Sequence, residues 1–365
     1  MQLSPIGRPL AEIDTPALLL DLTRLEHNIG VMAARIHSAG MQWRPHAKAF
    51  KCPAIAHILQ RAGAIGVTVA KVSEAEVMAA GGIDDILIAH LVVGPSKAAR
   101  LAALQRFADV KVTVDHPEHV APLGQAAVEA GVSIGVLVDV DLGMGRCGVA
   151  GAARGLSLAR CVAGTPGLRF DGIMGYEGHT LLIADLEEKR EAIGNAIGRL
   201  TEARVTLEEA GLACRIVSAG GSGSYQITSQ LPGVTELQAG GGIFACRYYT
   251  ELCRVEGHQP AITVRATVVS TPTPTRAILD AGRKAISDYR IPPIILDRPD
   301  LQITVLSAEH ATLELDRENS LQIGESLSVI PGYSDFTFVL HDRVIGLRAG
   351  RVESVWTLPG RGMLQ

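Results

Sequence analysis

Lys48 closely follows a short apolar segment, residues 41–45, that is typical of a buried strand. An amine at the buried end of a strand is desolvated, which lowers its pKa and makes the neutral form a better nucleophile toward aldehydes. The alternative interpretation is an ordinary loop lysine beside Lys51, and sequence position alone leaves both open. Lys48 is therefore a candidate for covalent catalysis.

A glycine-rich turn, residues 139–148 (DVDLGMGRCG), carries a second candidate, Arg146. A fixed guanidinium at the end of a strand could hold an anionic phenolate or carboxylate. A structural salt bridge from Arg146 to Asp139 or Asp141 is the other interpretation.

Residues 175–179 (GYEGH) end another apolar segment and contain two groups that could act on a ligand. Tyr176 could lie beside a flat ring, and His179 could transfer protons. For either residue alone, a packed or exposed structural role is the alternative.

Two glycine-rich segments complete the set: residues 218–225 (SAGGSGSY) and 238–243 (QAGGGI). Glycines let backbone N–H groups approach an anion closely, and the serine hydroxyls add hydrogen-bond donors. A lysine, an arginine and two such loops together fit a phosphorylated aldehyde cofactor held as an imine.

These residues follow strands that alternate with helices, which predicts an α/β protein with a parallel sheet. The predicted strands cover residues 41–45, 65–69, 86–89, 110–114, 134–140, 168–174, 215–218 and 235–238. Eight such units favour a closed (β/α)8 barrel of the TIM type, with an open doubly wound sheet as the alternative. Barrel enzymes place their sites at the carboxyl ends of the strands and commonly bind phosphate after strands seven and eight.

The pattern changes after about residue 254, where short strand-like segments replace helical periodicity. We therefore predict a barrel domain over residues 15–254 and a C-terminal β domain over 255–365. The segment 337–340 is one of the predicted strands. A first strand, residues 17–22, precedes the barrel and could join the β domain.

The composition of the 365 residues narrows the class of protein: the net charge is −4, 47% are hydrophobic and 20% are charged. A sizeable core is expected, and nucleic acid or an anionic membrane is a poor partner for this charge. The six cysteines contain no CxxC pair, and neither a signal peptide nor an 18-residue apolar span is visible. We expect a cytoplasmic protein with reduced thiols.

Seven segments of the chain resemble D-threonine aldolases and eukaryotic-type D-serine dehydratases, which are fold type III pyridoxal-phosphate (PLP) enzymes. They are RPHAKAFKCP (44–53), KVSEAEVMAAGGIDDIL (71–87), DLGMGRCGV (141–149), GYEGH (175–179), SAGGSGSY (218–225), TELQAGG (235–241) and DAGRKA (280–285). The resemblance implies an alanine-racemase-like barrel with a C-terminal β domain and PLP bound to Lys48. It also implies a homodimer with the active site near the subunit interface.

The resemblance further implies a role for each matching residue. Lys48 would form the imine and act as the α-proton base, Arg146 would approach the phenolic oxygen of PLP, and Tyr176 would lie by its ring. The phosphate would be held by Ser222, Gly223, Gly240 and Gly241, with Tyr225 as a further donor. Gln238 would face the pyridine nitrogen, where a neutral amide makes the ring a modest electron sink.

One position departs from the family pattern. Metal-dependent members carry a PxHxD or PxHxC motif that binds a divalent metal, whereas this chain has Tyr333 in place of the histidine and keeps Asp335. A neutral phenol is a poor metal ligand compared with imidazole. We expect the site for Mg²⁺, Mn²⁺ or Zn²⁺ at Asp335 to be weak or absent, although His310 or His341 could help to form one.

The leading functional prediction is retro-aldol cleavage of a small D-3-hydroxy amino acid, through an external aldimine formed in exchange for Lys48. His179 or Tyr333 would assist deprotonation of the β-hydroxyl. Dehydration of D-serine or a D-3-hydroxyaspartate-like acid is the second hypothesis, and it needs a Lewis acid or a strong general acid on the leaving hydroxide. Metal-independent racemisation or epimerisation by Lys48 and Tyr333 is the third.

A non-catalytic PLP carrier is the hypothesis from another class. Single-barrel carriers share the lysine and the phosphate loops but have no C-terminal β domain. Residues 255–365 of this chain therefore count against a carrier.

Overall fold

The computed structural model describes residues 5–315 and 321–365, which divide into two compact units. The barrel unit comprises Met32–Lys48, Pro53–Gly240 and Met363–Gln365. The β unit comprises the described parts of Met1–Val31, Ala49–Cys52 and Gly241–Gly362. Each unit is described by itself below, and the domain boundary expected near residue 254 stays a prediction.

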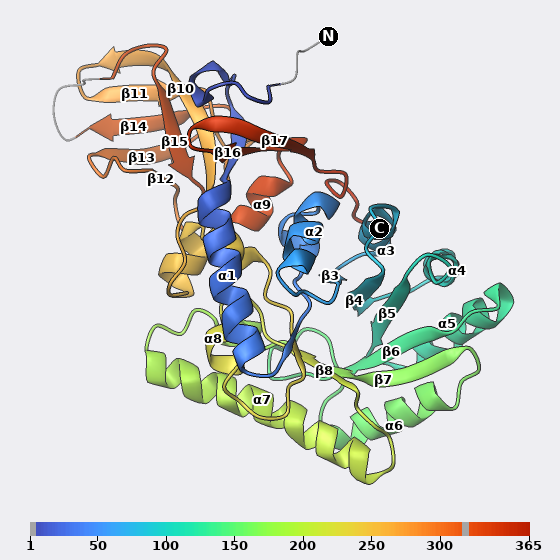
Figure 1. Cartoon of the computed structure of the whole chain (residues 1–365). Helices are drawn as coiled ribbons and strands as arrows, with labels where there is room; N and C mark the ends of the chain where they lie inside the picture. Colours follow the sequence, from blue (N-terminus) through green and yellow to red (C-terminus); the bar gives the residue numbers. More distant parts are fainter. Residues whose placement is uncertain (1–4, 316–320) are drawn as a thin grey trace. The chain divides into compact units, whose positions relative to one another are not determined.

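The barrel unit contains an eight-stranded parallel sheet (Figure 1). Its strands, in spatial order, are β2 (Gln42–Trp43), β9 (Glu236–Leu237), β8 (Ile216–Ala219), β7 (Leu168–Met174), β6 (Ile134–Asp139), β5 (Asp109–Val114), β4 (Asp85–Leu91) and β3 (Val67–Val69). Isolated parallel bridges, Trp43 with Ala64 and His46 with Thr68, join the two ends of this order. The sheet therefore closes on itself, as a barrel requires.

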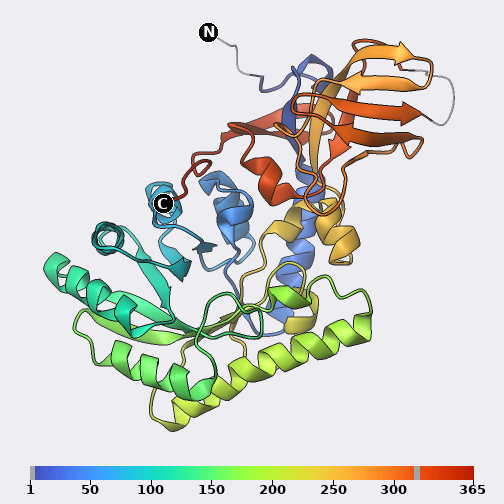
Figure 2. The same cartoon turned by 180° about the vertical axis from the view of Figure 1, so that it is seen from behind.

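Helices alternate with these strands, as the sequence pattern predicts. They are α2 (Pro53–Arg61), α3 (Val72–Ala80), α4 (Pro95–Leu104), α5 (Pro117–Ala130), α6 (Ala152–Ala163), α7 (Leu186–Glu209) and α8 (Tyr225–Thr228). Helices α5, α6 and α7 pack on strands β5 to β8 (Figure 2). Valines of the continuous apolar strands are buried, as expected for a parallel sheet covered on both faces.

Charged side chains connect the strands of the barrel near their first residues, and we call this set the charged ring. It consists of Arg44, Asp85, Asp109, Lys111, Arg169, Asp171, Arg215 and Glu236. Arg44 bonds the carboxylates of Glu236 at 3.1 Å and Asp85 at 2.5 Å. Lys111 then links Asp85 to Asp109 at 2.8 Å each, and Arg169 links Asp109 to Asp171.

The β unit contains a nine-stranded, mostly antiparallel sheet. Its strands are β1 (Ala17–Asp21), β10 (Ile262–Thr273), β11 (Arg276–Leu279), β12 (Ile294–Ile295), β13 (Leu301–Leu306), β14 (Ala311–Leu315), β15 (Ser326–Ile330), β16 (Arg343–Arg348) and β17 (Arg351–Thr357). Strand β1 lies between β10 and β16. Helix α1 (Leu22–Ser38) follows β1 and contains Val31, after which the chain passes into the barrel unit.

One predicted strand of the β unit is wrong. Residues 337–340 were expected to be extended, but Ser334–Phe338 form the short helix α9. The hydroxyl of Thr337 donates to the carbonyl of Tyr333 at 2.8 Å, one helical turn earlier. The backbone N–H of Thr337 donates to the same carbonyl at 3.2 Å, so the segment closes a helical turn although its apolar residues favour a strand.

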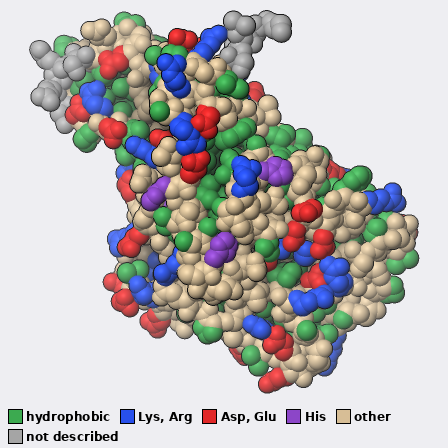
Figure 3. All heavy atoms as spheres, in the orientation of Figure 1, with side chains coloured by type: hydrophobic (Ala, Val, Ile, Leu, Met, Phe, Trp, Pro, Cys, Tyr) green, Lys and Arg blue, Asp and Glu red, His purple; other side chains and the backbone are tan. Residues whose placement is uncertain are grey.

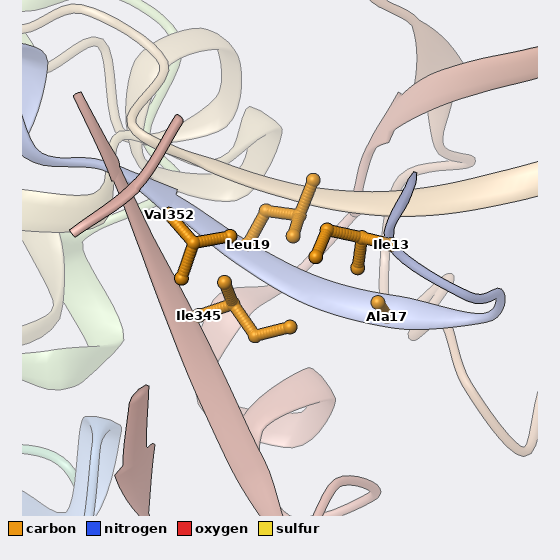
Figure 4. Packing of buried hydrophobic residues seen from close by; sticks show 5 residues of the cluster. All are labelled: Ile13, Ala17, Leu19, Ile345 and Val352. Carbon is orange, nitrogen blue, oxygen red and sulfur yellow. The ribbon is translucent and has the colours of Figure 1, made fainter. Parts of the chain in front are cut away.

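The core of the β unit joins the two ends of the chain. Ile13, Ala17 and Leu19 from the N-terminal segment pack against Ile345 of β16 and Val352 of β17 (Figure 4). Burial of each leucine, isoleucine or valine side chain in this cluster contributes roughly 1.5–3 kcal/mol. The N-terminal strand is therefore held in the β sheet by packing as well as by its backbone hydrogen bonds.

On the face drawn in Figure 3, acidic and basic side chains are intermixed, in keeping with the small net charge of −4. Among the described residues, none of the helices combines the length and apolar character needed to cross a bilayer.

Replacing Arg44 with methionine tests the charged ring. The change leaves the buried Glu236 carboxylate without its cation and should lower the free energy of unfolding by about 3–5 kcal/mol. Urea unfolding followed by circular dichroism measures the loss. The control is Arg100→Met, which breaks a more exposed pair with Glu76 and should cost about 0–1 kcal/mol. Equal losses in the two variants would contradict the assignment.

Candidate active site

Three predicted residues meet at the carboxyl end of the barrel. The Lys48 ammonium lies 5.9 Å from the centre of the Tyr176 ring, and the Arg146 guanidinium carbon lies 5.9 Å from the same centre. Lys48 sits in the short 3-10 helix Ala47–Ala49 after β2, and Tyr176 follows β7. The strand ends thus place two cations on one aromatic ring, which suits a flat anionic ligand.

The environment of Lys48 differs from the sequence-based argument. We expected a desolvated amine, but the side chain is exposed. Its ammonium nevertheless lies on the side of the Tyr176 ring, with Arg146 at the same distance. Its reactivity therefore does not follow from burial in this conformation of the protein.

The salt bridge considered for Arg146 is absent from the described residues, where neither Asp139 nor Asp141 pairs with it within 4.0 Å. The Asp141 carboxylate instead accepts backbone N–H groups of Gly143 and Gly145, at 2.9 and 3.2 Å, and so shapes the glycine-rich turn. Burial, with repulsion from Asp115, raises the pKa of Asp139 to about 7, and Arg146 opposes this rise. Arg146 is thus available to an anion beside Tyr176.

The two glycine-rich loops lie against each other and against Tyr176. The Ser222 hydroxyl accepts the backbone N–H of Gly240 at 3.1 Å. A Cβ atom on Gly240 would come within 2.6 Å of the His46 carbonyl oxygen, and one on Gly221 within 2.9 Å of the Tyr176 ring. Only glycine therefore fits at these two positions, where the backbone packs closely against His46 and Tyr176.

Glu177 is a residue that the sequence analysis missed. Its carboxylate is fully buried and accepts the Ser224 hydroxyl at 2.6 Å, the Thr228 hydroxyl at 2.8 Å and the Gly220 N–H at 3.3 Å. Glu177 therefore fixes the first glycine-rich loop to the end of β7. The only signal in the sequence is a carboxylate directly after an apolar strand, inside the GYEGH segment.

The remaining barrel candidates occupy different surroundings. Gln238 is buried at the end of β9, and its amide donates to the Ser218 hydroxyl at 2.9 Å. Tyr225 is fully buried at the start of α8, and burial raises its pKa to about 12. Gly223 is buried within the first glycine-rich loop, whereas His179 is exposed and turns toward the loop at Gly143.

Gly241, Tyr333 and Asp335 belong to the β unit and meet there. The Tyr333 hydroxyl donates to Asp335 Oδ2 at 2.9 Å, and Tyr249 donates to Oδ1 at 3.2 Å. A Cβ atom on Gly241 would lie 2.3 Å from the Tyr249 hydroxyl and 2.7 Å from Asp335. Burial, and then Asp335 itself, raise the pKa of Tyr249 well above its usual value, which keeps this donor protonated.

This arrangement does not fit a divalent metal. Both oxygens of Asp335 accept phenol hydroxyls, and Ser334 also donates to Oδ1 at 3.2 Å. His341, one of the two histidines that could help, bonds the Ala285 carbonyl through Nε2. Within the described residues, no three histidine, cysteine or acidic side chains gather as metal ligands would. The donors around Asp335 are hydroxyl groups, which are weak ligands for such ions.

Comparison with known families supports the barrel and the β unit separately. Residues 20–247 match the model of the alanine racemase N-terminal domain, and residues 261–347 match that of a putative serine dehydratase domain. The first match covers more than half of the chain. The predicted alanine-racemase-like barrel followed by a β-rich domain is thereby confirmed.

Individual relatives extend the similarity to nearly the whole chain. The chain is 39% identical to the D-threonine aldolase of Arthrobacter sp., over 98% of this chain and 95% of the relative. It is 36% identical to the 3-hydroxy-D-aspartate aldolase of Paracoccus denitrificans (strain Pd 1222), over 98% and 94%. A crystal structure of D-threonine aldolase from Filomicrobium marinum superposes with a TM-score of 0.96 at 36% identity, covering 99% of this chain and 100% of that one. The chain therefore belongs to the family of alanine-racemase-like lyases in which D-threonine aldolase and 3-hydroxy-D-aspartate aldolase are found.

Proposed function

We propose that this protein is a PLP-dependent lyase that cleaves the Cα–Cβ bond of a small D-3-hydroxy amino acid. The observation that carries the proposal is the convergence of Lys48 and Arg146 on the Tyr176 ring, in the same barrel end as two close-packed glycine loops. When bound, PLP supplies an electron-accepting ring that stabilises negative charge at Cα.

The barrel residues fit this cofactor. The glycine-rich loops around Ser222, Gly223 and Gly240 suit a phosphate, and the close approach of Gly240 to the His46 backbone leaves no room for a Cβ atom there. The family resemblance adds Gly241 as a further donor to the phosphate, and the buried Tyr225 as another. Arg146 would hold the phenolic oxygen, and Gln238 would face the ring nitrogen with a neutral amide.

Different side chains of the protein would provide the covalent attachment and carry out the two proton transfers of the reaction. Lys48 provides the amine for covalent attachment and, once released, moves the proton at Cα. Removal of the β-hydroxyl proton needs a second group, and we assign it to His179 or Tyr333. The Tyr333 hydroxyl is oriented by Asp335, which gives this phenol a fixed acceptor.

Two other reactions are less well supported. Dehydration needs a strong acid or a Lewis acid at the leaving hydroxide, and the hydroxyl groups around Asp335 are poor ligands for a metal. Racemisation would use Tyr333 as a second base, yet the relatives at 39% and 36% identity over 98% of this chain are named as aldolases. We further propose a homodimer, on the family resemblance, and a cytoplasmic location, on the scattered cysteines.

Lys48→Ala tests both the cofactor assignment and the reaction. Wild-type enzyme should release an aldehyde from a D-3-hydroxy amino acid. In the variant the rate of aldehyde release should be about 10²–10⁴-fold lower, which is the range for loss of a positioned acid–base group. Aldehyde, keto acid and the L-enantiomer are assayed in parallel. Borohydride reduction and peptide mapping of wild-type protein should place the pyridoxyl group on Lys48.

The other products separate the hypotheses. Keto acid as the main product would replace the aldolase with a dehydratase, and the L-enantiomer would indicate a racemase. A pyridoxyl group on another side chain would overturn the role of Lys48.

Glu177→Gln tests the support of the phosphate loop. The variant loses the negative charge that accepts Ser224, Thr228 and Gly220, so the loop should relax. We expect the dissociation constant of PLP to rise by about 10- to 100-fold, as for loss of one or two charge-assisted bonds. Fluorescence titration measures it. The matched change Glu188→Gln, on the exposed start of α7, should leave PLP binding unchanged. If the two variants had the same dissociation constant for PLP, Glu177 would not support the phosphate loop.

Tyr333→His tests the metal assignment. The change restores an imidazole beside Asp335 and frees Oδ2, so the variant should bind about one equivalent of Mn²⁺ where the wild type binds none. Calorimetry and elemental analysis after dialysis give the stoichiometry. Tyr289→His, in the same aromatic cluster but 5.5 Å away between ring centres, should bind no Mn²⁺. Stoichiometric Mn²⁺ in wild-type protein, lost in Asp335→Asn, would show that the family metal site persists.

A further inference from the structure

A cavity of the β unit is lined by residues from both ends of the chain. It has a volume of about 520 Å³, and its lining residues lie between positions 5 and 18 and between positions 340 and 345. Ile13, Ala17 and Ile345 are buried and pack together as its apolar wall (Figure 4). No residue proposed for the cofactor or for the reaction is among those that line it. Cavities of about 300–1,000 Å³ commonly hold small molecules, so this one is large enough for a ligand.

Backbone hydrogen bonds fix the N-terminal side of this cavity. The N–H of Gly7 donates to the Val352 carbonyl at 2.8 Å, and the N–H of Val352 donates to the Arg8 carbonyl at 2.9 Å. The N–H of Leu10 donates to the Gly350 carbonyl at 2.9 Å. The segment before β1 is therefore held along β17, and the charged side chains that it carries have defined positions.

Two arginines that line the cavity have no anionic partner in the described part of the chain. Neither Arg8 nor Arg343 forms an ion pair with a carboxylate of the described residues. Five other arginines of the β unit do form ion pairs: Arg247, Arg283, Arg298, Arg348 and Arg361. A guanidinium without an anion suits a carboxylate ligand, which accepts two parallel N–H groups from it.

Two carboxylates that line the same cavity also have no ionic partner. Glu12 and Asp14 form no ion pair with a described cation, and Asp14 accepts the backbone N–H of Thr15 at 3.0 Å. The third carboxylate, Asp342, is paired with Arg361 and adds no unpaired charge. The cavity thus presents both signs of charge, and these charges do not neutralise one another at contact distance.

His341 lines the cavity without adding a positive charge near neutral pH. Burial lowers the pKa of its imidazole, although the bond to the Ala285 carbonyl opposes this shift. Nε2 donates that bond at 2.8 Å, so the neutral ring carries its proton on this nitrogen. The unpaired charges of the cavity therefore come from two guanidinium groups and two carboxylates, and they sum to zero.

We propose that this cavity binds a free α-amino acid with an apolar side chain. A zwitterion offers one carboxylate to Arg8 or Arg343 and one ammonium to Glu12 or Asp14, and its side chain packs on the apolar wall. An anion without an ammonium leaves both carboxylates of the cavity unpaired, and an amine without a carboxylate leaves both arginines unpaired. The inference goes beyond the proposed function, because it does not depend on the reaction at Lys48.

L-Valine and two of its analogues test the requirement for both charges. The analogues share the side chain of valine, but 3-methylbutanoate lacks the ammonium and isobutylamine lacks the carboxylate. Holoenzyme reduced with borohydride is used, so that the amines form no imine with bound PLP. Calorimetry should give about one equivalent of L-valine per chain with a dissociation constant below about 1 mM, and each analogue should bind at least about tenfold more weakly.

Arg343→Gln and Glu12→Gln test the two halves of the site. Both side chains are exposed, so the variants should fold as the wild type does. The dissociation constant of L-valine should rise by about 10- to 100-fold in each, as for loss of a charge-assisted pair. The controls Arg276→Gln and Glu314→Gln make the same charge changes at exposed positions of β11 and β14 and should bind L-valine as the wild type does.

Each other outcome overturns the proposal. Absence of L-valine binding by the wild type would remove the site, and an analogue that binds as tightly as L-valine would remove the zwitterion as its ligand class. Equal losses in the cavity variants and in the controls would mean that L-valine binds elsewhere. If no pyridoxyl group is found on the reduced protein, the cofactor proposal fails, and the L-valine titration still decides this one.

Discussion

The ion pair between Arg44 and Glu236 joins two of the shortest strands of the barrel. Strands β2 and β9, which carry or precede these residues, are only two residues long each. Few ladder hydrogen bonds can form there, so side chains must supply the rest of the connection. Arg44 bonds Glu236 on one side and Asp85 on the other, and these carboxylates raise its pKa despite burial. A charged contact thus adds to the backbone bonds that close the sheet, and removing one of its partners would leave a buried charge uncompensated.

The contact between Arg44 and Glu236 also helps to position the proposed active-site residues at the carboxyl ends of the same strands. Lys48 lies four residues after Arg44, and the second glycine loop begins two residues after Glu236. A barrel that opened between β2 and β9 would separate the lysine from one half of the phosphate cradle. Glu177 performs a similar task inside the site, because it ties the first glycine loop to β7 and hence to Tyr176. Buried charged residues that are not proposed to contact the ligand therefore hold the proposed ligand-binding residues in position.

Sequence patterns predicted the elements of the barrel well and its polar interior poorly. Alternation of apolar strands with helices is a local property, so the eight strands and the residues at their ends could be identified. The partners of Glu177 or Arg44 lie 41 to 192 positions away, and spacing along the chain carries no sign of such pairs. The helix α9 was missed because a short apolar segment does not by itself distinguish a strand from a short helix. The exposure of Lys48 was missed because the position of a residue after a strand does not determine how far its side chain is buried.

The tyrosine at position 333, in place of the histidine of the family motif, affects more than one possible metal ligand. A phenol donates a hydrogen bond to Asp335, whereas a metal-binding imidazole would leave that carboxylate free to coordinate. Tyr249 supplies a second donor, and its raised pKa keeps it protonated over the ordinary pH range. The rings of Tyr248 and Phe336 pack against Tyr333 with centres 4.8 and 5.0 Å away, so the hydroxyl has little freedom to turn elsewhere. Aromatic packing around Tyr333 thus holds in place the hydrogen bond that its hydroxyl donates to Asp335.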